Sequence, residues 1–90
     1  MLEGCLKIVN PLGLHARAAA QLVRLAGRFS SRIILKRTDS GLFADAKSIL
    51  SVLTLAASMG TEIVITVDGN DASEAYEAVY ALISDGFGEI

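Results

Sequence analysis

The spacing of apolar residues changes repeatedly along this chain, and these changes restrict the possible fold more than any other feature of the sequence. Apolar and polar residues alternate with a period of two in residues 5–9 ("CLKIV") and 61–69 ("TEIVITVDG"), which is typical of half-buried β-strands. Residues 32–37 ("RIILKR") predict a further strand. After the turn residues 38–41 ("TDSG"), residues 42–46 predict a short returning strand.

Three other segments have the spacing of amphipathic helices. Residues 16–26 are apolar except for one polar stripe, which consists of Arg17, Gln21, Arg24 and, just beyond, Arg28. A short helix is predicted over residues 48–55, with Ser48 as its N-cap. A last helix is predicted to begin after Asp71, with an acidic residue three positions later as in a capping box, and to stop at Gly86.

These elements fit one small α+β fold. A chain of 90 residues can form one hydrophobic core, so we predict a single domain over residues 1–90. The helices need an apolar surface to cover, and one sheet of four strands supplies it. We therefore expect a two-layer sandwich with the helices on one face of the sheet.

The sequence also bears on where the protein works. No segment approaches the roughly 18–20 consecutive apolar residues of a membrane span. The first ten residues lack the charged start, apolar centre and cleavage site of a signal peptide. We therefore expect a cytoplasmic protein that does not insert into membranes.

Charge is distributed unevenly along the chain. All eight lysines and arginines lie in residues 1–47, whereas residues 48–90 contain only acidic charges. This asymmetry favours an acidic protein partner for the basic half, although a merely solvated basic face would look the same. The few basic residues, with no aromatic residues spaced for base stacking, argue against nucleic acid as the partner.

The single histidine lies where a loop meets the first predicted helix, in "GLHAR" at residues 13–17. A helix beginning near Ala16 directs its first backbone N–H groups, those of Ala16 and Arg17, toward His15. Such a helix end favours an anion, especially a phosphoryl group. The Arg17 guanidinium adds donors suited to phosphate oxygens. Because neutral imidazole is a nucleophile, the segment predicts a site that accepts and releases a phosphoryl group on His15.

Other chemistries fit this sequence poorly. A metal site needs several ligands, but His15 and Cys5 are the only residues of their kinds and no carboxylate cluster accompanies them. There is no Ser, His and acid constellation and no glycine loop of the Walker type. From these residues alone His15 could also be a simple cap or surface residue. If it reacts, we expect it to act without a cofactor, on a phosphoryl group delivered by a partner protein.

Two motifs in register resemble the HPr family of histidine phosphocarriers of the bacterial phosphotransferase system. They are "NPLGLHARAAAQLV" at residues 10–23 and "AKSILSVLTLAASMGTEI" at residues 46–63, and the likeness covers essentially the whole chain. The resemblance implies an open-faced β-sandwich of order βαββαβα, in which three helices lie on one face of a four-stranded antiparallel sheet. It also implies that phospho-Enzyme I phosphorylates His15, with Arg17 as its electrostatic partner, and that IIA domains receive the phosphoryl group. The chain would then be a monomeric carrier rather than an enzyme.

The resemblance further implies a docking surface for these partners. The helical stripe would face acidic partner surfaces, and the short helix would add an apolar contact; the residues concerned are Arg17, Gln21, Arg24, Arg28, Ile49, Leu50 and Leu53. From spacing alone, Ile49, Leu50 and Leu53 would be core residues. The resemblance predicts instead that Ile49 and Leu50 are partly exposed.

The resemblance also assigns Ser48 a regulatory role, as a phosphorylation site in organisms with a matching serine kinase. Alternatively, Ser48 is a plain N-cap, and the two roles are compatible.

Some departures from the family pattern leave the branch of the family open. Ala18 replaces a proline that family members commonly carry, and the terminal "DGFGEI" is similar to the nitrogen-type NPr branch. The alternatives are therefore a regulatory phosphocarrier of that branch, or a binding module of the same fold that is never phosphorylated.

Overall fold

The structure, a computed structural model, describes residues 1–89 of the chain. Four strands form one antiparallel sheet in the order β1-β4-β2-β3, where β1 is Leu2–Lys7, β2 Arg32–Arg37, β3 Phe43–Asp45 and β4 Glu62–Asp68. The helices are α1 (Ala16–Ala26), α2 (Ile49–Thr54) and α3 (Ala72–Ser84), and a 3₁₀ turn, η1, follows at Gly86–Gly88. The predicted element order and α+β class are confirmed.

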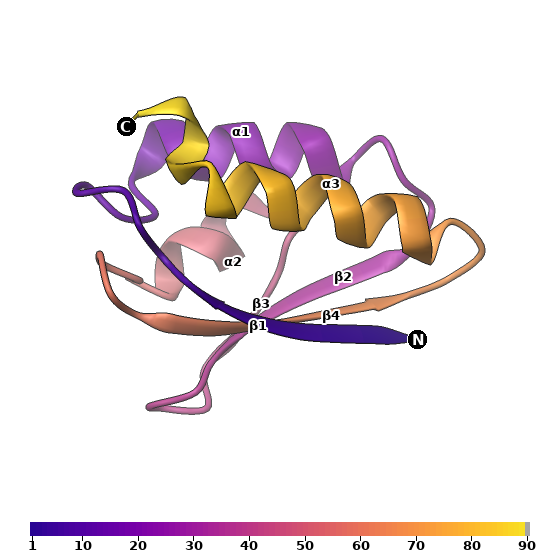
Figure 1. Ribbon diagram of the computed structural model, residues 1–90, viewed down its shortest axis with the longest axis horizontal. Helices are drawn as coiled ribbons and strands as arrows, with labels where there is room; N and C mark the ends of the chain where they lie inside the picture. Colours follow the sequence, from indigo (N-terminus) through magenta and orange to yellow (C-terminus); the bar gives the residue numbers. More distant parts are fainter. Residues whose placement is uncertain (90) are drawn as a thin grey trace.

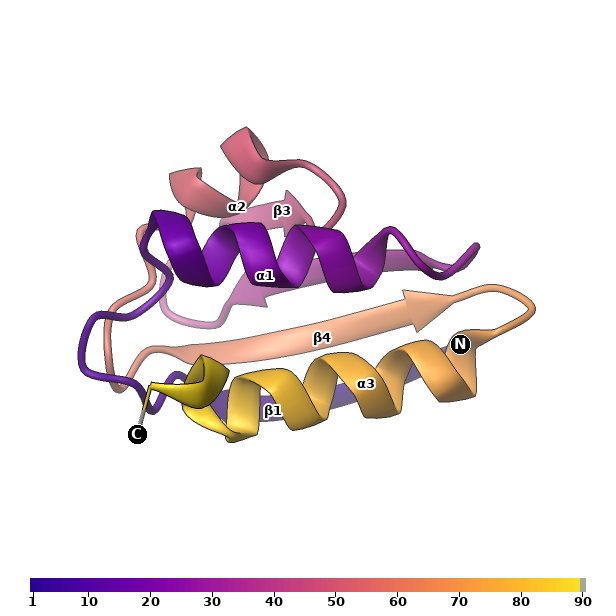
Figure 2. The ribbon, with the colours of Figure 1, turned by 90° about the horizontal axis from the view of Figure 1, so that it is seen from above.

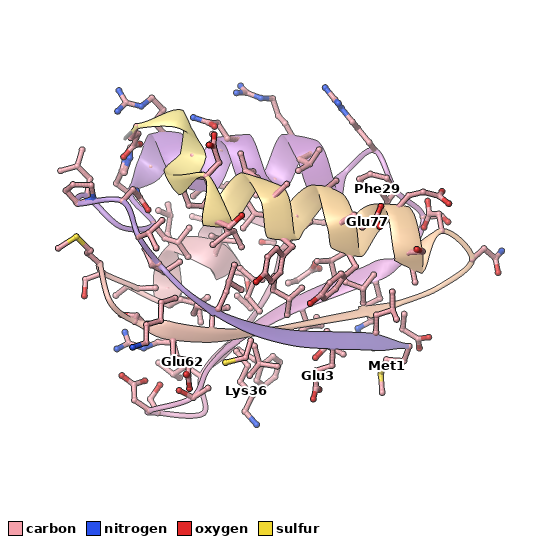
Figure 3. The ribbon with its side chains drawn as sticks, viewed as in Figure 1. Met1, Glu3, Phe29, Lys36, Glu62 and Glu77 are labelled. Atoms are coloured by element: carbon pink, nitrogen blue, oxygen red, sulfur yellow. The ribbon has the colours of Figure 1, made fainter. Side chains whose placement is uncertain are left out.

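All helices lie on one side of the sheet, as the sequence predicted (Figure 1). Viewed from above, α1 and α3 run side by side across the sheet, and α2 lies beside α1 over the edge formed by β3 (Figure 2). The other face of the sheet is open, and Glu3, Lys36 and Glu62 point away from the helices there (Figure 3). The molecule is an open-faced sandwich of two layers.

The core lies between these layers and consists of the residues that the spacing of apolar side chains predicts to be buried. Every second residue of β4 is fully buried, namely Ile63, Ile65 and Val67, because alternate side chains of a strand face the helices. Helix α1 contributes Ala18, Ala19, Leu22 and Ala26, all fully buried. These residues face the core, where α1 packs against α2 and α3, and its arginine stripe lies on the outside.

The first strand differs from the prediction. A strand was expected over residues 5–9, but β1 spans Leu2–Lys7 and pairs with β4 from Leu2 opposite Val67 to Lys7 opposite Glu62. Strand propensity is a weak guide where pairing with a central strand decides the outcome. Ile8 is still buried, and its N–H donates to the carbonyl oxygen of Thr61 at 2.9 Å. Leu6 and Ile8 face the core while Cys5, Lys7 and Val9 are exposed, as the alternation predicts.

The start of α3 also differs. Asp71 occupies the N-cap position, but its side chain makes no capping hydrogen bond, and no capping box forms. Instead its carboxylate accepts hydrogen bonds from the backbone N–H groups of Ser30 and Ser31, each at 2.9 Å, and from the Ser31 hydroxyl. These bonds lower the pKa of Asp71 to about 2, the Ser31 hydroxyl contributing most. Asp71 therefore connects the start of α3 to the loop that follows α1.

Candidate functional site

His15 is the N-cap residue of α1. Its backbone is extended (φ −73°, ψ 177°), and its carbonyl oxygen accepts the first helical hydrogen bond, from the N–H of Ala19 at 2.8 Å. The ring nitrogen Nδ1 accepts a hydrogen bond from the backbone N–H of Arg17 at 3.3 Å. A backbone N–H can only donate, so Nδ1 presents a lone pair to the start of the helix. With 24% of its side chain exposed, the imidazole is within reach of a partner.

The loop before His15 is held by contacts that require its glycine. Gly13 has φ +65°, and a Cβ atom there would lie 2.4 Å from the carbonyl oxygen of Ala57. The next residue, Leu14, is buried and donates its N–H to that same oxygen at 2.8 Å. The loop is thereby connected to the segment after α2, which sets the entry of the chain into His15.

A carboxylate that the sequence did not reveal completes the site. Oε2 of Glu89 contacts Nε2 of His15 and lies 3.4 Å from Nη2 of Arg17. Its other oxygen, Oε1, accepts from Nδ2 of Asn10 at 3.0 Å. Only 11% of the Glu89 side chain is exposed. The Asn10 hydrogen bond, followed by that from His15, holds the pKa of Glu89 below its ordinary value, so the carboxylate is ionised at neutral pH.

Asn10 is the second residue that sequence reasoning missed. It is fully buried, and its Nδ2 donates to the Gly13 carbonyl oxygen at 2.8 Å as well as to Glu89. Its position before a proline suggested only a loop. Glu89 is 74 positions from His15 in the chain, so no local pattern could have indicated their contact.

A shallow hollow lies beside these groups. Pro11 and Leu12 of the loop, Arg17 and Gln21 of α1, and residues 87–89 line it. The Arg17 side chain is 67% exposed and therefore free to change its contacts. Because Arg17 belongs to the first turn of α1, the hollow opens to solvent beside the start of that helix, where an anion is favoured.

Of the predicted docking residues, Arg17 and Gln21 line this hollow, and the others lie farther along α1, just beyond its end, and on α2. Arg24 and Arg28 are exposed, Gln21 is half-buried, and none of these side chains forms an ion pair within residues 1–89. On α2, Leu50 is 74% exposed and Ile49 is 40% exposed, whereas Leu53 is partly buried against the core. The two helices pack side by side, so the basic and apolar parts of this surface adjoin each other (Figure 2).

Ser48 is the N-cap of α2. Its hydroxyl oxygen accepts a hydrogen bond from the backbone N–H of Ser51 at 3.3 Å, and its backbone is extended. The side chain is half-buried and immediately precedes the exposed Ile49. The structure therefore confirms the capping geometry, next to the apolar part of the surface.

Residues 1–89 contain neither a metal-binding cluster nor a membrane-spanning helix. No group of three or more His, Cys, Asp or Glu side chains is arranged to hold a metal ion. No helix in this part of the chain has the length and apolar character needed to span a bilayer.

Comparison with known proteins gives a consistent result. The family description "PTS HPr component phosphorylation site" matches residues 2–85. The phosphocarrier protein HPr of Cupriavidus necator is 47% identical over 89 residues, which cover 99% of this chain and 98% of that protein. Among solved structures, HPr from Thermoanaerobacter tengcongensis superimposes with a TM-score of 0.92 at 38% identity, covering 100% of this chain and 99% of the other. A second structure from that organism, described as an HPr dimer, gives a TM-score of 0.77 at 38% identity over 99% and 100% of the two chains.

Proposed function

The chain belongs to the HPr family of phosphocarrier proteins of the phosphotransferase system, and on this basis we propose that His15 is the residue that carries the phosphoryl group. The observation that supports it most directly is the Nδ1 lone pair of His15, directed at the first N–H groups of α1. Phospho-Enzyme I is the proposed donor, and IIA domains are the proposed acceptors. The phosphoryl group stays on His15 only transiently, so the protein is a carrier and not an enzyme.

The proposed transfer needs no cofactor. The lone pair of Nδ1 forms the new N–P bond while the bond between phosphorus and the donor breaks, and its electron pair leaves with the donor. The backbone N–H of Ala16 has no acceptor within the helix, and that of Arg17 loses its acceptor, Nδ1, when the N–P bond forms, so both can donate to the phosphoryl oxygens. Arg17 supplies a mobile cation for the same oxygens. Reversal of these steps delivers the group to the acceptor.

The surface around His15 suits short-lived complexes. Arg24 and Arg28 present positive charge to acidic partner surfaces, which accelerates encounter. Leu50 and Ile49 provide a small apolar contact, Leu53 supports it from a partly buried position, and the half-buried Gln21 adds a polar group on α1. A small apolar centre with a charged rim limits affinity, which allows donor and acceptor to use the same surface in turn.

Ser48 is proposed as a regulatory phosphorylation site for a serine kinase. Its capping position tolerates added negative charge, since helix starts favour anions. The adjoining apolar contact does not tolerate it, because docking would have to remove water from the phosphate.

The protein is proposed to work as a single cytoplasmic domain and as a monomer. One chain supplies every group of the site, namely Asn10, His15, Arg17 and Glu89, so no second copy is needed to complete it. The acceptor could belong to a sugar-uptake or a nitrogen-type regulatory branch, and both use the same chemistry on His15.

The direct test is incubation with Enzyme I and phosphoenolpyruvate, followed by mass measurement. The protein should gain one phosphoryl group that is labile in acid and stable in base, and the gain should require Enzyme I. His15→Ala should abolish it. Phosphoryl uptake that survives in His15→Ala would place the group elsewhere, and no uptake by the wild type would favour a binding module that is never phosphorylated.

A further inference from the structure

Glu89 makes contacts that the proposed function does not use. Glu89 lies outside residues 2–85, the part of the chain that the family description matches. Three side chains converge on its carboxylate: Asn10 on one oxygen, and His15 and Arg17 on the other. A nearly buried carboxylate with this many donors has a defined position.

Two parts of the fold fix the position of Glu89: the turn η1 and the side chain of Asn10. Phe87 is 97% buried and has a left-handed backbone (φ +58°), a conformation that persists only where surrounding packing enforces it. The N–H of Glu89 donates to the carbonyl oxygen of Gly86 at 3.0 Å, which closes the turn η1. The buried amide of Asn10 connects the carboxylate to the loop that carries His15.

The two contacts of the imidazole select the same tautomer. An ionised carboxylate only accepts, so the ring nitrogen that faces Glu89, Nε2, carries the hydrogen. The N–H of Arg17 only donates, so Nδ1 must be unprotonated. If the hydrogen moved to Nδ1, both contacts would become unfavourable at once.

We propose that Glu89 is a positioning residue for the phosphocarrier reaction, which holds His15 as the Nε2–H tautomer and keeps Nδ1 unprotonated for phosphorylation. When Nδ1 bonds to phosphorus, the hydrogen stays on Nε2 and the ring becomes positively charged. The carboxylate of Glu89 then neutralises that charge, and no proton has to leave the site. This inference depends on the proposed function only for the reacting group, since the tautomer exists without any donor.

Glu89 does not compete with the phosphoryl group for the nucleophile. It contacts Nε2, while the incoming group approaches Nδ1 at the start of α1. Two contacts of Arg17 have to change. Its backbone N–H releases Nδ1, to which it donates at 3.3 Å, and its guanidinium gives up the long contact with Glu89, at 3.4 Å, from a side chain that is two-thirds exposed. Arg17 can therefore turn to the phosphoryl oxygens while Glu89 keeps its contact with His15.

The first experiment measures the tautomer without any partner. Nitrogen NMR of the protein with isotope-labelled histidine, at a pH where imidazole is neutral, should show a protonated Nε2 and an unprotonated Nδ1 in the wild type. Glu89→Ala should shift both signals toward a mixture of the two tautomers, whereas Glu89→Gln, which keeps an acceptor oxygen, should restore the wild-type pattern. Glu77→Ala, which removes an exposed charge from α3, is the matched control and should change nothing.

The second experiment measures transfer from phospho-Enzyme I in a single turnover. We expect Glu89→Ala to slow phosphorylation about tenfold, the scale of one lost hydrogen bond to a charged group, and Glu77→Ala to keep the wild-type rate. Glu89→Gln should react at an intermediate rate, because it restores the tautomer and not the charge. The amide spectrum of each variant verifies the fold.

The outcomes separate the two proposals. A wild-type protein with its hydrogen on Nδ1, or a Glu89→Ala spectrum identical to the wild type, overturns the role of Glu89 even if His15 is phosphorylated normally. Wild-type protein that never accepts a phosphoryl group overturns the proposed function, whatever the NMR spectra show.

Discussion

Leu14 donates its backbone N–H to the carbonyl oxygen of Ala57 at 2.8 Å, which joins the residue before His15 to the segment that follows α2. The two helices of the proposed docking surface are therefore connected at the site as well as along their sides. A partner that contacts α2 binds a part of the fold that also positions the imidazole.

This connection leads to a prediction about Gly13. In Gly13→Ala the new Cβ would meet the Ala57 oxygen, and the left-handed backbone would add strain of about 1–3 kcal/mol. We expect a clear loss of unfolding free energy in urea, together with slower phosphorylation of His15. Gly41→Ala is the control, because Gly41 has a similar φ of +76° and open space around a Cβ. Equal effects of the two substitutions on stability and on transfer would show that the contact with Ala57 is unimportant.

A second prediction concerns stability in acid. Asp71 has a pKa of about 2 in the folded protein against an ordinary value of 3.8, so its hydrogen bonds stabilise the fold fully above about pH 4. This contribution should disappear as the pH falls from about 4 to 2. Asp71→Asn should therefore be less stable than the wild type at pH 7, and the difference should narrow toward pH 2.

Urea unfolding at a series of pH values measures this difference. Asp68→Asn, which alters an exposed carboxylate at the end of β4, should leave the pH profile unchanged. Phosphorylation of His15 should be normal in Asp71→Asn, because Asp71 contacts Ser30 and Ser31 rather than the site. A constant stability difference between wild type and Asp71→Asn across this pH range would contradict the assignment.

The fold was predictable because the regular spacing of apolar residues in each strand and helix is a strong and local signal. The alternation of Ile63, Ile65 and Val67, and the alanine-rich face of α1, correctly predicted the buried residues and the side of the sheet they occupy. The position of β1 was less predictable. Leu2, Glu3 and Gly4 form a strand only because they pair with β4, and pairing between distant segments leaves no local signal.

The local geometry around His15 was predictable from the sequence, but the full set of residues that contact it was not. The position of His15 before a helix follows from local sequence, and the backbone groups that face it follow from helix geometry. Glu89 and Asn10 join the site through contacts across the whole fold. Asp71 is also governed by a contact between distant segments. Its sequence pattern predicts a helix cap, but its carboxylate accepts hydrogen bonds from the loop after α1 instead.

The arginine stripe gives a prediction about salt. Arg24→Ala should raise the concentration of phospho-Enzyme I needed for half-maximal transfer without changing the rate at saturation. This effect should fade with added salt, since exposed charges are screened over about 10 Å at about 0.1 M ionic strength. Arg17→Ala should lower the saturated rate as well, because Arg17 lies within reach of the phosphoryl oxygens and Arg24 does not. Transfer kinetics at low and high salt distinguish the two, and identical changes in both variants would refute separate roles.

The last prediction concerns Ser48, where two substitutions separate capping from docking. Ser48→Ala removes the hydroxyl that accepts from Ser51, at a cost of about 0.5–2 kcal/mol, and leaves the surface uncharged. Ser48→Asp keeps a capping oxygen and places a negative charge beside Ile49 and Leu50, which are proposed to meet acidic partners. We therefore expect Ser48→Ala to melt at a lower temperature yet accept phosphoryl groups at the normal rate. Ser48→Asp should melt no lower than the wild type and accept them much more slowly. Thermal melting and transfer from phospho-Enzyme I measure the two effects, and a Ser48→Asp protein with normal transfer and a lowered melting temperature would leave Ser48 with the capping role alone.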